Sequence, residues 1–217
     1  MMKYNDEHNF LIPSGVRPIK AAIFSAHPDD ETIWMGGTVL SRSDWNWKIF
    51  IATHKENDER GIELQKAVYE YKIQSDNLQI EYEFINIMVD TQNENQIDIS
   101  EVTQKLNKIS IDNFDVIFTH NIDGEYGHIN HKILGNYFKK KSKDGLNIWH
   151  FLCPGIQNPR KKEVGKYIET TFLNPTILAK KTAIFQCAYT SQHFLWTGFA
   201  DFMRHQFCSG VEIFTQY

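Results

Sequence analysis

The chain has 217 residues, of which 41% are hydrophobic and 23% are charged, so it can build one large packed domain and is not a disordered segment. Its 23 basic and 27 acidic residues give a net charge of −4, which does not favour a nucleic-acid partner. The three cysteines, at 153, 187 and 208, form no C-x-x-C pair, which excludes a cysteine-based zinc module and indicates reduced thiols in a cytoplasmic protein. We also expect no membrane span and no signal peptide, because no apolar run is long enough for either.

Short apolar runs alternate with segments of helical periodicity along the chain. We predict strands at 19–26, 47–53, 81–87, 115–119 and 146–152, and helices at about 31–43, 60–74, 100–109 and 130–141. The pattern is less regular after Cys153, where Pro154, Pro159 and the basic stretch 160–162 indicate a surface loop. One more strand at 167–173 and a helix at 175–189, with a proline at its start, follow. The alternation predicts a single α/β domain over residues 1–217, a three-layer sandwich with a mostly parallel, Rossmann-like sheet.

Two of the predicted strands end in unusual polar sequences. The first strand is followed by AHPDDE at 26–31, where the proline and the acids suit a helix start but do not account for His27. The fourth strand is followed by THNIDGEYGHINH at 119–131, in which His128 and His131 lie on one face if that segment is helical. Ligands of open α/β sheets bind at the carboxyl ends of the strands, so we expect the two segments to meet at one edge of the sheet.

Together the two segments supply two histidines and a carboxylate, which is the ligand set of many catalytic zinc sites. Such a site leaves one position open for water, which the metal makes acidic. The remaining carboxylate and histidine of the two segments suit a general base and an oxyanion stabiliser.

These motifs resemble those of the LmbE-like (PIG-L) zinc-dependent de-N-acetylases, which act on compounds that contain N-acetylglucosamine. The motifs are AHPDDE, the following GGT at 36–38, and GEYGHINH at 124–131. The resemblance is strong over 21–40 and 115–137, and weaker over 51–66 and 180–214. It implies an LmbE-like fold and a zinc ion bound by His27, Asp30 and His131.

The same resemblance implies the remaining roles. Asp29 is similar to the general base that deprotonates the attacking water, and His128 to the residue that stabilises the oxyanion and protonates the leaving amine. Tyr126 is similar to a tyrosine that polarises the amide carbonyl. Arg60, in the R-x-x-E segment 60–63, is similar to the arginine that contacts the substrate. The two catalytic groups are then expected to begin the reaction in opposite protonation states, which predicts a bell-shaped pH profile.

The sequence departs from the family pattern at two places. The second histidine motif usually reads H-P-D-H, whereas Ile129 and Asn130 stand between the histidines here. The segment after the second strand usually reads T-x-G-E, whereas Lys55 replaces the glycine, which puts the local turn and the placement of Arg60 in question. Near the C-terminus, Ser191-Gln192 and the stretch 212–214 resemble the family's S-Q pair and E-x-F.

The other histidines and acids have weaker assignments. We expect His54 to line the pocket at most, and His120 to order a ligand or the loop rather than bind metal. Asp123 and Glu125 either order the histidine loop, meet the substrate or are solvated. The basic run at 139–143 is expected to be a solvated helix end, and structural roles are expected for the remaining histidines: His8, His150, His193 and His205.

These observations favour a zinc-dependent hydrolase that removes an N-acetyl group from a small-molecule amino sugar or its conjugate. Two alternatives stay open: a zinc amidase acting on a non-sugar amide, and a non-catalytic metal- or sugar-binding domain on the same fold. The presence of Asp29 favours catalysis, because a binding module needs no general base. Homo-oligomerisation is also left open by the sequence.

Overall fold

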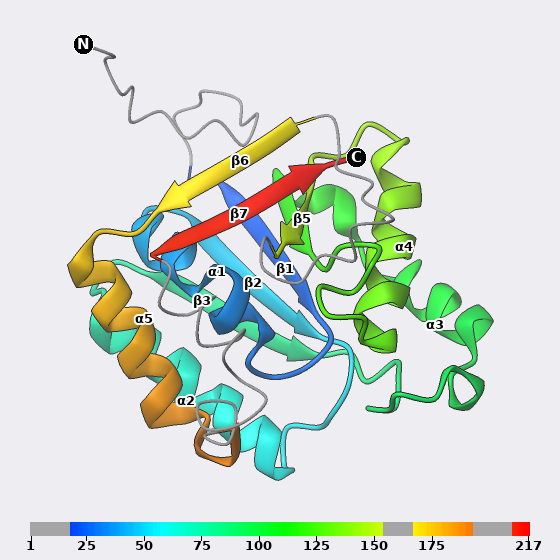
Figure 1. The fold of residues 1–217 in the computed structure, drawn as a ribbon, viewed down its shortest axis with the longest axis horizontal. Coiled ribbons are helices and arrows are strands. Elements are labelled where there is room, and N and C mark those ends of the chain that lie inside the picture. The colour runs from blue at the N-terminus through cyan, green and yellow to red at the C-terminus, as the bar shows by residue number, and fades with distance from the viewer. Residues whose placement is uncertain (1–17, 154–166, 193–209) are drawn as a thin grey trace.

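The computed structural model describes residues 18–153, 167–192 and 210–217. Seven strands form one sheet in the order β3-β2-β1-β4-β5-β7-β6, with helices on both faces (Figure 1). Strands β1 to β5 are mutually parallel, while β7 is antiparallel to both of its neighbours, β5 and β6. The strands are β1 (Lys20–Ser25), β2 (Asn46–Ile51), β3 (Gln79–Phe84), β4 (Val116–Thr119), β5 (Ile148–Leu152), β6 (Tyr167–Phe172) and β7 (Val211–Gln216). The helices are α1 (Asp30–Ser41), α2 (Glu59–Gln74), α3 (Ile99–Leu106), α4 (Ile129–Ser142) and α5 (Pro175–Ala188), with short 3-10 turns at Glu94–Gln96 and Ile111–Asn113.

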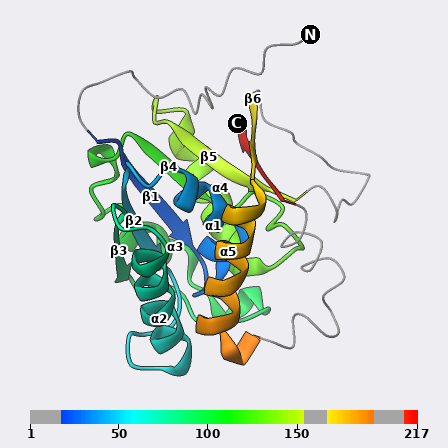
Figure 2. The same ribbon diagram turned by 90° about the vertical axis from the view of Figure 1, so that its left-hand side faces the viewer.

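The sheet divides the interior into two cores, because side chains alternate along each strand. Helices α1, α2 and α5 lie on one face of the sheet (Figure 2), and their residues form a cluster with Ala21 and Ile23 of β1. On the other face Ala22 and Phe24 of the same strand pack with residues of α3 and α4. The predicted three-layer α/β sandwich with a mostly parallel sheet is therefore confirmed.

Helix α1 is kinked at Met35, whose φ of −149° is not helical. Glu212 of β7 caps the second half of the helix by accepting the backbone N–H groups of Gly37 and Thr38 at 2.8 and 2.7 Å. Its carboxylate is balanced by Lys181 of α5 at 2.7 Å, and both side chains are fully buried. Glu212, the first residue of the late E-x-F sequence, thus fixes the position of α1, and Asp30 lies in the first turn of that helix.

The predicted elements agree with the structure to within a few residues at each end. The strand that the sequence did not predict is β7, which is six residues long and inserts antiparallel between β5 and β6. The predicted loop at 160–162, with Pro154 and Pro159, lies outside the described residues, as do Cys208 and three histidines, His8, His193 and His205. Within the described part of the chain, no helix is both long and apolar enough to cross a bilayer.

Candidate metal centre and active site

The polar segments meet where the sheet changes its winding direction. The chain proceeds from β1 outward to β2 and β3, and then crosses back to place β4 on the other side of β1. Such a switch point leaves a crevice at the carboxyl ends of the two central strands, here β1 and β4. His27, Asp29 and Asp30 follow β1 directly, and the loop after β4 leads to His128 and His131 at the start of α4. The sequence expectation that the two segments share one edge is confirmed.

Three donor atoms form a compact triangle in this crevice. His27 Nδ1 lies 3.1 Å from His131 Nε2 and 3.3 Å from Asp30 Oδ2, and the third side, His131 Nε2 to Asp30 Oδ2, is 3.5 Å. A tetrahedral zinc ion with ligands at about 2.0–2.2 Å places its donor atoms about 3.3–3.6 Å apart. The triangle therefore has the size that such an ion requires, and all three side chains are buried. Two sets of three side chains next to this triangle also have donor atoms close enough to hold a metal ion. One is His27, His128 and His131, and the other is Asp30, His120 and His131.

Two carboxylates lie behind the histidines of the triangle. His131 Nδ1 contacts Glu125 Oε2 at 2.6 Å, and His27 Nε2 contacts Asp90 Oδ1 at 3.1 Å. A carboxylate at the second ring nitrogen fixes the tautomer of a metal-binding histidine and raises its basicity. In the metal-free protein, burial opposes the charge on His27, but hydrogen bonds and charges from Asp30 and Asp90 raise its pKa to about 10.

His120 supports the triangle from beside it. Its Nε2 accepts the backbone N–H of Ala26 at 2.9 Å, and its Nδ1 contacts Glu125 at 3.0 Å, so both ring nitrogens are engaged by protein groups. The ring stacks on His131 with centroids 3.8 Å apart. This arrangement agrees with the ordering role expected from the sequence. Similarly, His150 is fully buried, and its Nδ1 lies 2.7 Å from the backbone carbonyl of His120, as suits a structural histidine.

Asp29 has an unusual backbone conformation, with a φ of 121° that a residue other than glycine rarely adopts. Its backbone N–H donates to Glu31 Oε2 at 3.1 Å, and its Oδ2 forms a 2.8 Å ion pair with Arg60. Arg60 also donates to the backbone carbonyl of Pro28 and lies 3.7 Å from Glu63. The Arg60 side chain is 12% exposed, so its contacts are mainly with the chain itself and it fixes Asp29 in place.

The replacement of a glycine by Lys55 does not displace Arg60. Asp58 caps α2 by accepting the N–H of Gly61 at 2.7 Å, which starts the helix one residue before Arg60. The backbone of α2 packs closely against the backbone at Lys55, and Gly61 makes this possible, since a Cβ there would lie 2.0 Å from the carbonyl oxygen of Lys55. Glu63 completes the R-x-x-E segment by accepting the Oγ–H of Ser191 at 2.8 Å, which explains the serine of the S-Q pair.

His128 and Tyr126 complete the wall of the crevice. His128 is the N-cap of α4, and its Nδ1 accepts the backbone N–H of Asn130 at 3.3 Å. In the neutral ring the proton is therefore on Nε2. The Tyr126 ring lies 5.2 Å from that of His131 and 6.0 Å from that of His128. Burial and the charges of Asp30 and Asp29 raise the pKa of Tyr126, so its hydroxyl remains a donor at neutral pH.

The protonation states of the two catalytic candidates are set by their surroundings. Burial raises the pKa of Asp29 to about 6 against the opposing charge of Arg60, so Asp29 is mostly ionised at pH 7. Burial and the neighbouring His27 and His131 lower the pKa of His128 to about 3. In the metal-free protein His128 is thus neutral at pH 7, in contrast to the protonated starting state expected of an acid. A neutral His128 can donate a hydrogen bond through Nε2.

The structure brings all seven predicted site residues into one cluster, with Arg60 joining it through Asp29. It adds Asp90, which sequence reasoning missed. This carboxylate contacts His27, lies 3.5 Å from His54 Nε2 and 3.8 Å from His128 Nε2, and has a pKa lowered by hydrogen bonds from His27 and His54. His54 therefore stands at the rim of the site, which its position after the second strand allowed but did not require. Asp90 follows the third predicted strand, so the rule that ligands bind at strand ends could have found it.

Comparisons with known proteins agree with this fold. Among solved structures, Dbv21, the deacetylase of A40926 pseudoaglycone, has a TM-score of 0.63 at 10% identity, over 92% of this chain and 96% of that chain. The teicoplanin deacetylase Orf2 in a zinc-inhibited form gives a TM-score of 0.59 at 14% identity, over 86% and 90%. The N,N'-diacetylchitobiose deacetylase of Pyrococcus horikoshii gives 0.53 at 18%, over 90% and 82%. At these identities the likeness shows the fold alone.

No curated protein matches the chain in sequence. A family model does match, over residues 22–140, a span that holds more than half of the chain and every predicted site residue. The strand ends, the buried donor triangle and this match lead to one assignment: the chain belongs to the PIG-L family, described as GlcNAc-PI de-N-acetylase.

Proposed function

We propose that the protein is a zinc-dependent hydrolase that removes the N-acetyl group from an amino sugar of N-acetylglucosamine type or from its conjugate. The observation that carries this proposal is the triangle of His27 Nδ1, Asp30 Oδ2 and His131 Nε2, with sides of 3.1 to 3.5 Å, next to Asp29, whose backbone is strained. Nitrogen and oxygen donors in this number suit zinc, which the three residues would hold with a position left for substrate. When bound, the ion supplies Lewis acidity to the scissile amide and acidifies the attacking water.

Asp29 is the proton carrier of the reaction in this proposal. Its ionised carboxylate accepts a proton from the water as the water attacks the carbonyl carbon. The leaving nitrogen must be protonated before the C–N bond breaks, and the proton on Asp29 is available for that step. Arg60 acts as a positioning residue, because its 2.8 Å ion pair keeps Asp29 ionised and oriented.

His128 and Tyr126 serve as donors to the oxygen that becomes negative in the transition state. The neutral His128 ring presents Nε2–H, since its Nδ1 accepts from the backbone of Asn130. Tyr126 presents a phenol that burial keeps protonated. Donors fixed before the reaction stabilise developing charge without reorganising, which is commonly the largest contribution to catalysis.

The sugar part of the proposal draws on the family description and on relatives in structure. The family model is described as a GlcNAc-PI de-N-acetylase, and one structural neighbour is a deacetylase of N,N'-diacetylchitobiose. A zinc amidase for a non-sugar amide would use the same catalytic groups and is the second candidate. A non-catalytic binding domain is disfavoured by Asp29, since holding a metal gives no reason for its strained backbone.

We further propose that residues 1–217 form a single LmbE-like domain that acts in the cytoplasm on a small molecule. The exposed Cys187 is a free thiol, which supports a reducing compartment.

The proposal is tested by acetate release from a panel of N-acetylated sugars, with zinc-loaded protein and with protein stripped by a chelator. We expect release from at least one amino sugar, abolished by the chelator and restored by zinc. Release from N-acetylated amino acids or polyamines alone would favour the non-sugar amidase. No release from any compound by fully loaded protein would refute the enzymatic assignment.

A further inference from the structure

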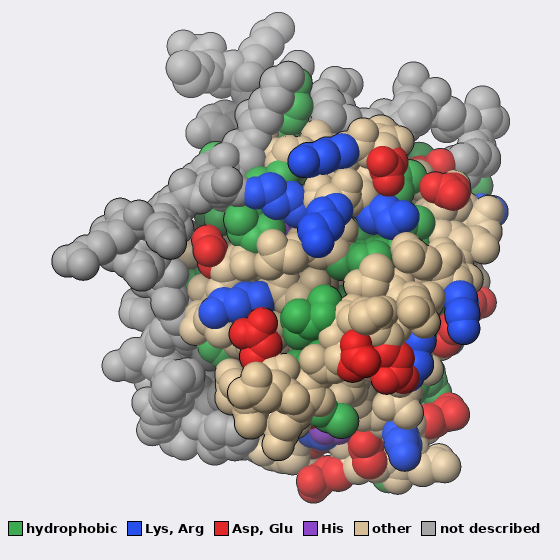
Figure 3. Space-filling model, turned by 90° about the vertical axis from the view of Figure 1, so that its right-hand side faces the viewer, with side chains coloured by type: hydrophobic (Ala, Val, Ile, Leu, Met, Phe, Trp, Pro, Cys, Tyr) green, Lys and Arg blue, Asp and Glu red, His purple; other side chains and the backbone are tan. Residues whose placement is uncertain are grey.

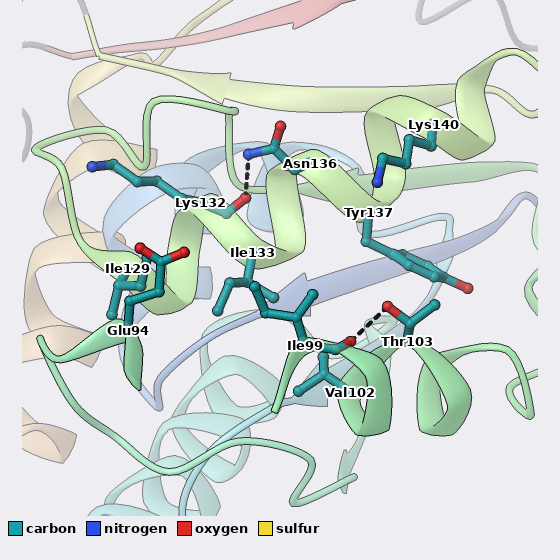
Figure 4. A pocket seen from close by; sticks show the side chains of 10 residues that line it. All are labelled: Glu94, Ile99, Val102, Thr103, Ile129, Lys132, Ile133, Asn136, Tyr137 and Lys140. Carbon is teal, nitrogen blue, oxygen red and sulfur yellow. Dashed lines mark hydrogen bonds between the residues drawn. The ribbon is translucent and has the colours of Figure 1, made fainter. Parts of the chain in front are cut away.

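A groove lies between α3 and α4, away from the donor triangle (Figure 4). Its volume is about 410 Å³, which is within the range of small-molecule sites. The groove is lined on the α4 side by residues that include 129, 133 and 140. His131 is two residues from both 129 and 133, so its side chain projects from nearly the opposite side of the helix. The groove and the metal centre therefore share α4 but not a surface.

The floor of the groove is apolar. Val102 of α3 and Ile133 of α4 are 2% and 8% exposed, and Ile129 lies beside them. Ile99 faces Ile133 across the groove, yet 47% of it remains exposed (Figure 4). An isoleucine that is half uncovered beside other apolar groups gains free energy when a ligand covers it, at about 25 cal/mol for each Å² buried.

The rim of the groove is predominantly basic. Lys132 and Lys140 line it, and Glu94 is the acid among its lining residues. Neither lysine has a carboxylate partner within the described part of the chain. The last turn of α4 adds Lys139 and Lys141, and Figure 3 shows basic side chains gathered on the upper part of this face. The basic run that the sequence suggested was merely solvated thus adjoins the Lys140 end of an apolar groove.

We propose that this groove binds a single-chain amphiphile with an anionic head group, such as a fatty-acid carboxylate free in solution. The apolar chain lies over Ile99, Val102 and Ile133, and the head group lies at the Lys140 end, away from Glu94. Lys132 and Lys140 are eight residues apart, about 12 Å along the helix, which gives room for a medium-length chain between them. Charge complementarity favours an anionic head group, since a cationic ammonium head would be repelled by Lys132 and Lys140.

Other occupants fit the groove less well. A peptide helix or a second copy of the chain needs about 800 Å² on each partner for a stable interface, far more than this concavity offers. A flat lipid surface would need apolar side chains that protrude, whereas Val102 and Ile133 lie at the bottom of the groove.

The experiment is calorimetric titration of the zinc-loaded full chain with sodium decanoate, in the presence of excess acetate to occupy the metal centre. Decylamine, with the same tail and a cationic head, is the comparison ligand. We expect saturable decanoate binding at one site and at least about fivefold weaker binding of decylamine. Equal affinity for the two ligands would overturn the assignment of an anionic head.

Surface variants separate the groove from the metal centre. Ile99→Asp should weaken decanoate binding at least about tenfold, since it removes an apolar contact and adds a negative charge. Lys140→Glu should weaken it about fivefold, whereas Lys143→Glu, an exposed lysine on the same helix end and outside the groove, should change it less than about twofold. Glu94→Gln should strengthen it.

Two results would overturn the proposal. One is decanoate binding that is unchanged in both Ile99→Asp and Lys140→Glu, which would place the ligand elsewhere. The other is sedimentation equilibrium showing a dimer that Ile99→Asp dissociates, which would assign the groove to a second copy of the chain. Circular dichroism of each variant verifies that the fold is retained.

Discussion

Replacing Glu125 by glutamine should weaken metal binding although Glu125 would not touch the metal. The carboxylate accepts hydrogen bonds from His131 at 2.6 Å and His120 at 3.0 Å. It is fully buried, and although burial raises its pKa, the charge and hydrogen bonds of His120 and His131 lower that pKa to about 2. Glu125 is therefore ionised at every pH at which the protein would work.

Glutamine keeps the shape of the side chain but loses its charge. Its single acceptor oxygen can serve one histidine, while its amide nitrogen faces the other. A hydrogen bond to a charged group contributes about 1.5–3 kcal/mol, against about 0.5–1.5 kcal/mol for a neutral one. The loss should be about 1.4–2.7 kcal/mol, a 10–100-fold rise in the dissociation constant of zinc.

The assay is competition for zinc with a chromophoric chelator at pH 7. Asp123→Asn is the matched control, because Asp123 lies in the same loop, is exposed, and should leave the affinity unchanged. An unchanged zinc affinity in Glu125→Gln, with circular dichroism like that of the wild type, would refute the reasoning that Glu125 orients His131.

Three further predictions concern protons and stability. Zinc binding should release about one proton at pH 7, because His27 has a pKa of about 10 in the metal-free protein and must lose its proton to bind the ion. Calorimetry in buffers of different ionisation enthalpy measures the number of protons released. Zinc binding without proton release would contradict the assignment of His27 as a ligand. On the acidic limb of its pH profile, kcat/KM should rise about tenfold per pH unit up to about pH 6, because Asp29 acts ionised and burial raises its pKa to about 6 against Arg60; a rate that is flat from pH 5 to 7 would exclude Asp29 as the base. Glu212→Gln should lower the free energy of unfolding by about 3–5 kcal/mol in urea denaturation, since it removes the carboxylate that balances the buried Lys181; a loss below about 1 kcal/mol would contradict the stabilising role of this ion pair.

The sequence predicted the part of the fold that depends on local pattern. Buried parallel strands are short apolar runs, and β1, β2 and β4 were recognisable for that reason. β7 was not, because its alternating sequence is not a continuous apolar run and its place between β5 and β6 depends on partners distant in sequence. A pairing of that kind has no local signature.

The site was predictable to the same degree. Its ligand residues stand in two dense motifs, each directly after a strand, so His27 and His131 could be placed together from topology alone. Asp90 stands outside both motifs; its position after the third strand places it at the same edge of the sheet, but only the structure shows its contact with His27. The neutral state of His128 also required the structure, because it follows from burial and from the histidines beside it.

The central claim is that His27, Asp30 and His131 hold the metal while Asp29 moves the proton. It is tested most directly by measuring zinc content and acetate release on the same preparations of the wild type and of the Asp29→Ala, Asp30→Ala and His131→Ala variants. The account predicts that Asp29→Ala retains one zinc per chain and loses most of its turnover, whereas His131→Ala loses the zinc. Loss of zinc from Asp29→Ala with zinc retained in Asp30→Ala would contradict it, because the two aspartates would then have exchanged roles.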